Sequence, residues 1–171
     1  PGELGDAASC RALCRGAEAV VHAALYRPGS GFAGKEGDLL TFAEKNIIGS
    51  LQLIEAGRRA GVGRFIFIST CAVHDVILDD RPLDETHPLW PKSHYGASKA
   101  AVEKFVSSFG LGEGYPICAL RPTGIYGAAG VPEESRWFSL IEAVAHDRPV
   151  SCSGGGKEVH AADVARAVSL L

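Results

Sequence analysis

A tyrosine and a lysine stand four positions apart in the sequence, at Tyr95 and Lys99. The residues around them favour a helix, and side chains four apart on a helix lie on the same face. An ammonium beside a phenol favours the phenolate form, so Tyr95 could exchange a proton with a substrate near neutral pH. The same spacing also arises by accident on solvated helix faces. The pair is therefore a candidate acid/base centre whose surroundings have to support it.

Two hydroxyl residues, Ser69 and Thr70, follow an apolar run that ends at Ile68. The carboxyl ends of parallel strands face the crevice where ligands bind in α/β sheets. A hydroxyl at this place could donate a hydrogen bond to a substrate oxygen beside Tyr95. The alternative is that Ser69 and Thr70 only cap a turn.

A glycine-rich segment, Gly29 to Glu36, matches G-x-G-x-x-G and comes close to the phosphate-binding pattern G-x-x-x-x-G-K-[ST]. The phosphate-binding loop needs a hydroxyl at its last position to hold magnesium, whereas Glu36 would place a negative charge beside the phosphates. The dinucleotide version needs its first glycine directly after a strand, and Arg27 and Pro28 intervene. We therefore expect that this segment binds no phosphate.

The composition is typical of a water-soluble globular protein: 171 residues, 46% of them hydrophobic and 22% charged. A net charge of −3 without a basic cluster excludes nucleic acid as the default partner. No apolar stretch approaches the roughly 20 residues of a membrane span, and the first residues do not resemble a signal peptide, so we expect a cytoplasmic protein with no membrane partner. The five cysteines are scattered without a C-x-x-C pair and predict neither disulfides nor a zinc site. Cys10 and Cys14 are expected to share one helix face in the core.

Short apolar runs alternate with helical segments along the chain. The run from Phe65 to Ile68 has almost no polar face, which is typical of a strand buried on both sides. This alternation indicates an α/β fold with a doubly wound parallel sheet of the Rossmann type. The expected strands are 19–25, 64–69, 115–120 and a short strand or hairpin within 150–159; the expected helices are 7–15, 38–60, 93–109, 133–146 and 161–171, and 79–91 and 121–132 are expected as loop and turns.

Further short segments accompany the tyrosine and the lysine in a fixed order. They are Val20–Ala24, Asn46–Leu51, Phe65–Thr70, Asp84-Glu85 ahead of Pro88, Tyr95–Lys99, Leu120–Gly127 and Val159–Ala165. In this order and spacing the chain resembles the extended short-chain dehydrogenase/reductases, the group that includes the NAD-dependent epimerases and dehydratases of nucleotide sugars. Seven concordant segments over nearly the whole chain are much more specific than any one of them.

The resemblance implies a role for each matching residue of the candidate site. Tyr95 would be the catalytic acid/base, and Lys99 would be its electrostatic partner and would also hold the nicotinamide ribose. Thr70 would orient the substrate oxygen. Asn46 would support the site from a neighbouring helix.

The implied cofactor is NAD or NADP. The residues implied to contact it, besides Tyr95 and Lys99, are Glu3 and Leu4 at the adenine edge, Ala23 and Ala24 along the dinucleotide, and Pro122 and Thr123 beside the nicotinamide. His22 and His160 also match family patterns, and we expect each of them to be a packed, hydrogen-bonded histidine.

The chain departs from the family pattern in ways that affect both fold and substrate. The glycine-rich turn T-G-x-x-G-x-x-G, which holds the pyrophosphate, is absent. We therefore expect a fold incomplete at both ends, with 1–130 as the central and C-terminal part of the cofactor domain and 131–171 as the start of the substrate-binding region. An apolar strand edge at 19–25 would then be exposed, so the isolated chain is expected to be poorly soluble and to bind no dinucleotide tightly.

Two positions bear on the type of reaction. Cys71 and Ala72 stand where the family's sugar dehydratases carry an Asp-Glu pair, so dehydration by that route is not expected. Gly124 stands where several epimerases carry a substrate-contacting Asn. The sequence therefore does not decide whether the substrate is a nucleotide sugar.

We therefore expect an NAD(P)-dependent oxidoreductase or epimerase that acts on a secondary alcohol or ketone of a small molecule. A nucleotide sugar is among the substrates that this expectation covers. The alternative is a non-catalytic dinucleotide-sensing or scaffold protein that keeps the fold. The joint presence of Thr70, Tyr95 and Lys99 argues against it, because a pure binding protein does not need all three. Epimerisation and simple oxidation share these residues, and the sequence leaves room for a homodimer.

Overall fold

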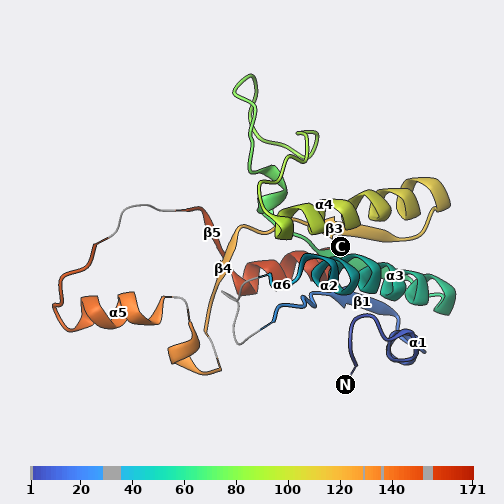
Figure 1. Ribbon diagram of the computed structural model, residues 1–171, viewed down its shortest axis with the longest axis horizontal. Helices are drawn as coiled ribbons and strands as arrows, with labels where there is room; N and C mark the ends of the chain where they lie inside the picture. The colour runs from blue at the N-terminus through green and yellow to red at the C-terminus, as the bar shows by residue number, and fades with distance from the viewer. Residues whose placement is uncertain (1, 29–35, 129, 136, 152–155) are drawn as a thin grey trace.

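Three parallel strands form the central sheet of the computed structural model (Figure 1). They are β1 (Ala19–His22), β2 (Arg64–Ile68) and β3 (Ile117–Leu120), in the spatial order β1-β2-β3. The structure describes residues 2–28, 36–128, 130–135, 137–151 and 156–171. The parallel pairing confirms the α/β architecture that the alternation of segments predicts.

Helices and helical turns surround the strands along the chain, and side chains cap the starts of several of them. They are α1 (Ala7–Cys14), α2 (Leu39–Ala43), the π-helical turn η1 (Glu44–Ile48), α3 (Gly49–Ala60), the 3₁₀ turn η2 (Cys71–His74), α4 (His94–Ser107), the π-helical turn η3 (Ser108–Gly112), the 3₁₀ turn η4 (Pro132–Glu134), α5 (Phe138–Ala145) and α6 (Ala161–Leu170). The side chains of Asp6, Asp38 and Ser93 accept backbone N–H groups at the starts of α1, α2 and α4. Gly61, with φ 72°, ends α3 in the left-handed conformation.

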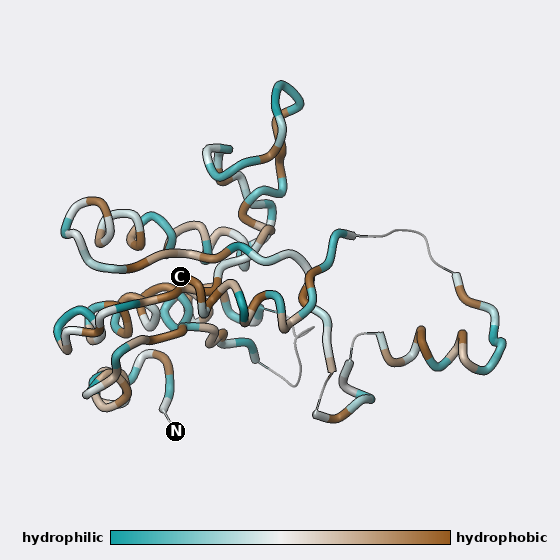
Figure 2. The backbone as a smooth tube through the Cα atoms, turned by 180° about the vertical axis from the view of Figure 1, so that it is seen from behind, coloured by the Kyte–Doolittle hydropathy of each residue, from teal (hydrophilic) through white to brown (hydrophobic). Residues whose placement is uncertain are grey.

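The core lies between one face of the sheet and the helices α1, α3 and α4. Phe65 and Phe67 of β2 point to this face, and both are fully buried. Cys10 and Cys14 of α1 are buried in the same cluster, which confirms the prediction that they are core residues. Ile66 is buried on the opposite face, so β2 is covered on both sides as its apolar pattern predicts. Figure 2 shows the strands as hydrophobic segments of the backbone tube.

Strand β1 lies at the edge of the described sheet and pairs with β2. Its burial alternates, because Val20 and His22 face the core whereas Val21 is 49% exposed. The strand ends at His22, three residues before the predicted end, so Ala23 and Ala24 already belong to the following loop. The low solubility expected of the isolated chain remains a prediction.

The second half of the chain differs from the sequence-based prediction. Strands β4 (Gly124–Tyr126) and β5 (Glu158–His160) pair in parallel as a separate two-stranded sheet. The prediction of turns only for 121–132 is therefore wrong, and of the two alternatives for 150–159 the short strand is found instead of the hairpin. Because the two strands lie far apart in the chain, no local pattern could reveal their pairing. The segment that carries α5 extends away from the central sheet (Figure 1).

His22 and His160, the two histidines that match family patterns, have different surroundings. His22 is 1% exposed, and its Nε2 lies 2.8 Å from Ser50 Oγ. Because Ser50 donates its own proton to the carbonyl oxygen of Asn46, His22 Nε2 is the donor to Ser50. His160 is exposed; its Nδ1 accepts the Ala162 N–H at the start of α6, so it is hydrogen-bonded as predicted but lies at the surface.

The first turn of α4 packs directly against η2 at a glycine. A Cβ atom on Gly96 would lie 2.6 Å from the carbonyl oxygen of Ala72 and 2.8 Å from Cβ of Pro91. Only glycine allows this approach, which brings the helix that carries Tyr95 against the turn that follows Thr70.

Two further findings concern the described residues as a group. None of the helices in the described ranges is long and apolar enough to cross a membrane. Cys10, Cys14, Cys71 and Cys118, the cysteines of the described part, are free thiols.

We expect the substitution Gly96→Ala to destabilise the protein. Alanine normally stabilises a helix interior by roughly 1 kcal/mol relative to glycine. At this position the new methyl group meets a backbone oxygen that cannot move without breaking η2, so we expect a net loss of about 1–3 kcal/mol. Gly112→Ala is the matched control, because nothing lies within 4 Å of its Cβ position. Denaturant unfolding measures both, and equal stabilities of the two variants would contradict the close approach.

We expect His22 to make the folded state sensitive to acid. The pKa of His22 is lowered from 6.5 to about 4, mainly by burial and to a smaller extent by the charge of Lys99. Between these two values the unfolded chain binds more protons than the folded chain, so the stability falls as the pH is lowered through this window. His22→Gln keeps a donor for Ser50. Between pH 7 and pH 4 its free energy of unfolding should fall by about 2–3 kcal/mol less than that of the wild type. Parallel denaturant curves at both pH values test this, and identical pH dependences would contradict it.

Candidate functional site

Tyr95 is the second residue of α4 and is held from two sides by the loop that follows β1. Its backbone N–H donates to Oε1 of Glu36 over 2.7 Å. The guanidinium of Arg27 lies over the Tyr95 ring, 5.0 Å from the ring centroid. Sequence reasoning did not identify Arg27 or Glu36 as partners of the tyrosine. The signal for these partners in the sequence was that Arg27 and Glu36 flank the glycine-rich segment. Residues 29–35 of that segment lie outside the described residues.

Lys99 follows Tyr95 by one helical turn, and its ammonium is buried. The side chain donates to the carbonyl oxygen of Ile68 at the end of β2 over 2.8 Å, and Nζ lies 4.6 Å from the centroid of the Phe67 ring. Burial lowers the pKa of Lys99 to about 8, and the negative charge of Glu103 opposes this shift. No hydrogen bond joins Lys99 to Tyr95 within the described ranges. The cation that lies over the tyrosine ring is Arg27.

Thr70 is the second residue after the end of β2, as the sequence predicts. Its Oγ1 accepts the backbone N–H of Ala72 over 3.2 Å and so caps η2. This contact is the turn-capping alternative that the sequence left open. Because Ala72 also touches Gly96, Thr70 and Tyr95 lie on either side of the same contact between η2 and α4. A role in orienting a substrate oxygen stays a prediction.

Asn46 links the π-helical turn η1 to the loop after β1. Its Oδ1 accepts the N–H of Tyr26 over 2.8 Å, and its Nδ2 donates to the carbonyl oxygens of Tyr26 and Phe42, both over 3.0 Å. The amide therefore satisfies both backbone groups of Tyr26, the residue before Arg27. Through this contact Asn46 fixes the backbone from which Arg27 reaches Tyr95.

The residues implied to contact a dinucleotide fall into two groups. Glu3, Leu4 and Ala24 line an open cavity of about 630 Å³ together with residues of α1. Its walls are mostly apolar, and its volume suits a nucleoside-sized group. The Glu3 carboxylate faces Lys45 in an ion pair of 2.6 Å. This cavity therefore fits the adenosine part of the implied cofactor, and Ala24, which lines it, and its neighbour Ala23 are both exposed residues.

Pro122 and Thr123 form the second group. They follow β3 in the chain, separated from it by Arg121. The carbonyl oxygen of Pro122 accepts the N–H of Cys71 over 2.9 Å, so the chain after β3 is joined to the chain after β2. Pro122 and Thr123 thus lie at the same edge of the sheet as Thr70, since the two strands are parallel.

A buried ion pair that sequence reasoning did not identify lies behind this edge. Glu103 of α4 is 4% exposed and accepts hydrogen bonds from Ser69 Oγ and from the guanidinium of Arg121. Arg121 Nη1 also lies 3.0 Å from Nε2 of His74 in η2. The spacing of Glu103 four residues after Lys99 was the available signal, because it places both charges on one face of α4.

Comparisons with known proteins bear on the family. The model of the "NAD dependent epimerase/dehydratase family" matches residues 1–171. The chain is 34% identical over 132 residues to a dTDP-D-glucose 4,6-dehydratase of Mus musculus, covering 74% of this chain and 36% of the relative. It is 34% identical over 114 residues to a UDP-glucose 4-epimerase of Rhizobium meliloti (strain 1021), covering 67% of this chain and 34% of the relative.

The fold is similar to that of a solved UDP-glucose 4-epimerase from Thermus thermophilus in complex with NAD. The TM-score is 0.78 at 30% sequence identity, and the match covers 99% of this chain and 58% of that one. The chain thus spans about a third of the length of the curated relatives it matches. The similarity confirms the Rossmann-type fold and the enzyme family that the seven segments resemble. By sequence and by fold, the chain belongs to the NAD-dependent epimerase/dehydratase family.

Proposed function

We propose that the protein containing this chain transfers a hydride between NAD and a secondary alcohol carbon of a nucleotide sugar. The relatives named above act on sugars attached to dTDP or UDP, and one solved neighbour holds NAD. The chemical proposal is an epimerase or dehydrogenase reaction in which Tyr95 moves the alcohol proton.

The observation that carries this proposal is the buried ammonium of Lys99, one turn after Tyr95. A charge that is 7% exposed is costly to bury, and its pKa of about 8 keeps it positive at neutral pH. Strongly shifted pKa values gather at functional sites. A scaffold or dinucleotide sensor that only keeps the fold would gain nothing from this buried charge beside the tyrosine.

The chain's own residues divide the work as follows. Tyr95 takes the proton of the substrate hydroxyl during oxidation and returns a proton to the carbonyl oxygen during reduction. Thr70 orients the same oxygen, and Lys99 supplies positive charge that favours the phenolate.

The bound nicotinamide would supply the hydride acceptor and donor for this chemistry. The adenosine side would be held at the cavity lined by Glu3, Leu4 and Ala24. Pro122, Thr123 and Lys99 would contact the nicotinamide side, and the backbone of Ala23 would lie along the dinucleotide.

The residues of η2 favour epimerisation or oxidation over loss of water. Elimination needs a base near the carbon that loses its proton, and η2 offers Cys71, Ala72, Val73 and His74 without a carboxylate. This distinction separates the two kinds of reaction found among the relatives.

We expect Tyr95→Phe to abolish turnover without abolishing cofactor binding. The full-length protein is incubated with UDP-glucose and NAD, and UDP-galactose and NADH are followed by chromatography and by absorbance. Loss of a positioned acid/base group reduces the rate by about 10²–10⁴-fold, whereas the NAD dissociation constant, measured by calorimetry, should change little.

Tyr126→Phe is the matched control for this experiment, because Tyr126 lies half-exposed on β4 and contacts the His160 ring. It should turn over like the wild type. Full turnover by Tyr95→Phe would remove the proposed acid/base role, and catalysis would then have to be assigned to another residue.

A further inference from the structure

Helix α4 contacts two consecutive residues at the end of β2 with side chains of opposite charge. Lys99 donates to the carbonyl oxygen of Ile68 over 2.8 Å. One turn later, the carboxylate of Glu103 accepts the hydroxyl of Ser69. The residue after Ser69 is Thr70. The strand end that presents the Thr70 hydroxyl is therefore held by both Lys99 and Glu103.

The carboxylate of Glu103 also holds the end of β3. Arg121 Nη2 lies 2.6 Å from Oε2, and Arg121 Nε lies 3.1 Å from Oε1 and 3.0 Å from Oε2. This forked arrangement fixes the guanidinium in direction as well as distance. Arg121 directly precedes Pro122, and Pro122 is joined to the backbone of Cys71. One carboxylate therefore connects α4 to the carboxyl ends of two neighbouring strands.

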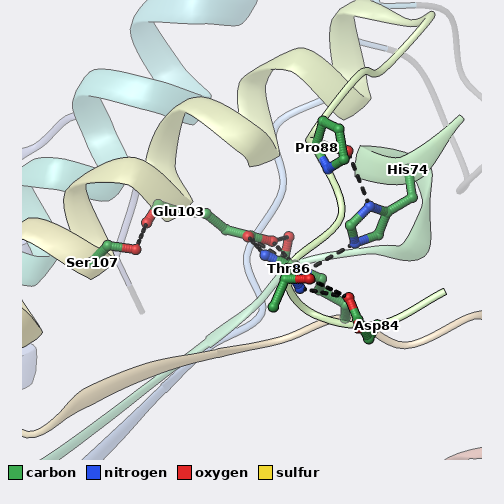
Figure 3. Close-up of polar contacts among 8 residues, drawn as sticks. His74, Asp84, Thr86, Pro88, Glu103 and Ser107 are labelled. Atoms are coloured by element: carbon green, nitrogen blue, oxygen red, sulfur yellow. Dashed lines mark hydrogen bonds and ion pairs between the residues drawn. The ribbon is translucent and has the colours of Figure 1, made fainter. Parts of the chain in front are cut away.

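A third arm runs from Arg121 to the loop before α4. Arg121 Nη1 lies 3.0 Å from His74 Nε2, and His74 Nδ1 lies 3.3 Å from the carbonyl oxygen of Pro88. Since a guanidinium can only donate, Nε2 accepts and the proton of His74 is on Nδ1, which donates to Pro88. Figure 3 shows His74 between Pro88 and the contacts that lead to Glu103.

Stability alone does not require this buried pair. Apolar residues of the same volume are often as stable as a buried ion pair, or more stable. The arms of the network end next to residues of the proposed site: Ser69 beside Thr70, Arg121 beside Pro122, and His74 in the turn that Thr70 caps.

We propose that Glu103 is a positioning residue of the active site. Through Ser69 and Arg121 it holds the end of β2, with Thr70 and the Ile68 carbonyl that binds Lys99, in register with Tyr95. This inference rests on the proposed function, since it assigns a role within the same site. Glu103 acts through other residues and does not touch the substrate.

The test is Glu103→Gln in the full-length protein, with UDP-glucose and NAD as probes. Glutamine keeps the shape and one oxygen acceptor but removes the charge that holds Arg121. We expect kcat to fall by about 10–100-fold, as displacements of about 1 Å in a site commonly cause, while the KM for UDP-glucose changes by less than about 3-fold.

A pH profile separates positioning from a general loss of structure. The groups that face Lys99 are Glu103 from its own helix, the neutral His22 from β1, and the Phe67 ring and Ile68 carbonyl from β2. Glu103 is the only negative charge in this set, and it raises the pKa of Lys99. In Glu103→Gln the ammonium should therefore lose its proton at lower pH than about 8, and the alkaline limb of kcat should move to lower pH.

The titration of Lys99 can also be measured without turnover. The ¹³Cε signal of Lys99 in lysine-labelled protein, assigned by its absence in Lys99→Arg, should titrate at lower pH in Glu103→Gln. This measurement distinguishes the two proposals, because it does not depend on Tyr95. Absence of turnover by the wild-type protein would reject the proposed function, whereas an unmoved Lys99 signal and an unchanged kcat in Glu103→Gln would reject the role of Glu103.

Two further variants complete the experiment. Glu55→Gln removes a carboxylate of the same kind from a surface pair with Arg58 on α3, and it should leave kcat and the Lys99 signal as in the wild type. Ser69→Ala removes one arm and keeps the charge, so it answers the question if Glu103→Gln does not fold. It should lower kcat with an unmoved Lys99 signal, and wild-type kcat would overturn the proposal.

Discussion

The position of α4 against the end of β2 is the constraint on which the candidate site depends. Lys99 and Glu103 are charges of opposite sign on one buried face of this helix, and burial is tolerated because each has hydrogen-bonding partners. Those partners belong to the ends of β2 and β3. The helix cannot slide or rotate without leaving a buried charge unpaired, so Tyr95 is held at the same edge of the sheet.

A second set of contacts approaches Tyr95 from the opposite direction. Asn46 binds both backbone groups of Tyr26, and the loop that continues from there carries Arg27 over the tyrosine ring. Parallel strands make this convergence possible, because the loops after β1, β2 and β3 all leave the sheet at one edge. The site is thus assembled from three loops and one helix, with buried polar contacts behind each of them.

Local patterns were sufficient to predict most of the elements. The apolar run at Phe65–Ile68 and the helical segments 7–15 and 93–109 were predicted from residues that lie within those segments, and the structure has β2, α1 and α4 there. Pairing between β4 and β5 was not predictable in this way. Each strand has three residues, and its partner lies beyond α5, so neither carries a pattern long enough to be distinguished from a turn.

By itself the sequence determined the strands of the central sheet and the helices around them, the family, and the candidates Thr70, Tyr95 and Lys99, because these follow from short-range spacing and from motifs. Only the tertiary structure decided what the charges touch. Lys99 binds a carbonyl 31 positions away, and Arg121 binds a carboxylate 18 positions away. A helical spacing of four shows that two side chains share a face, but burial and the neighbouring strands decide which partner each of them meets.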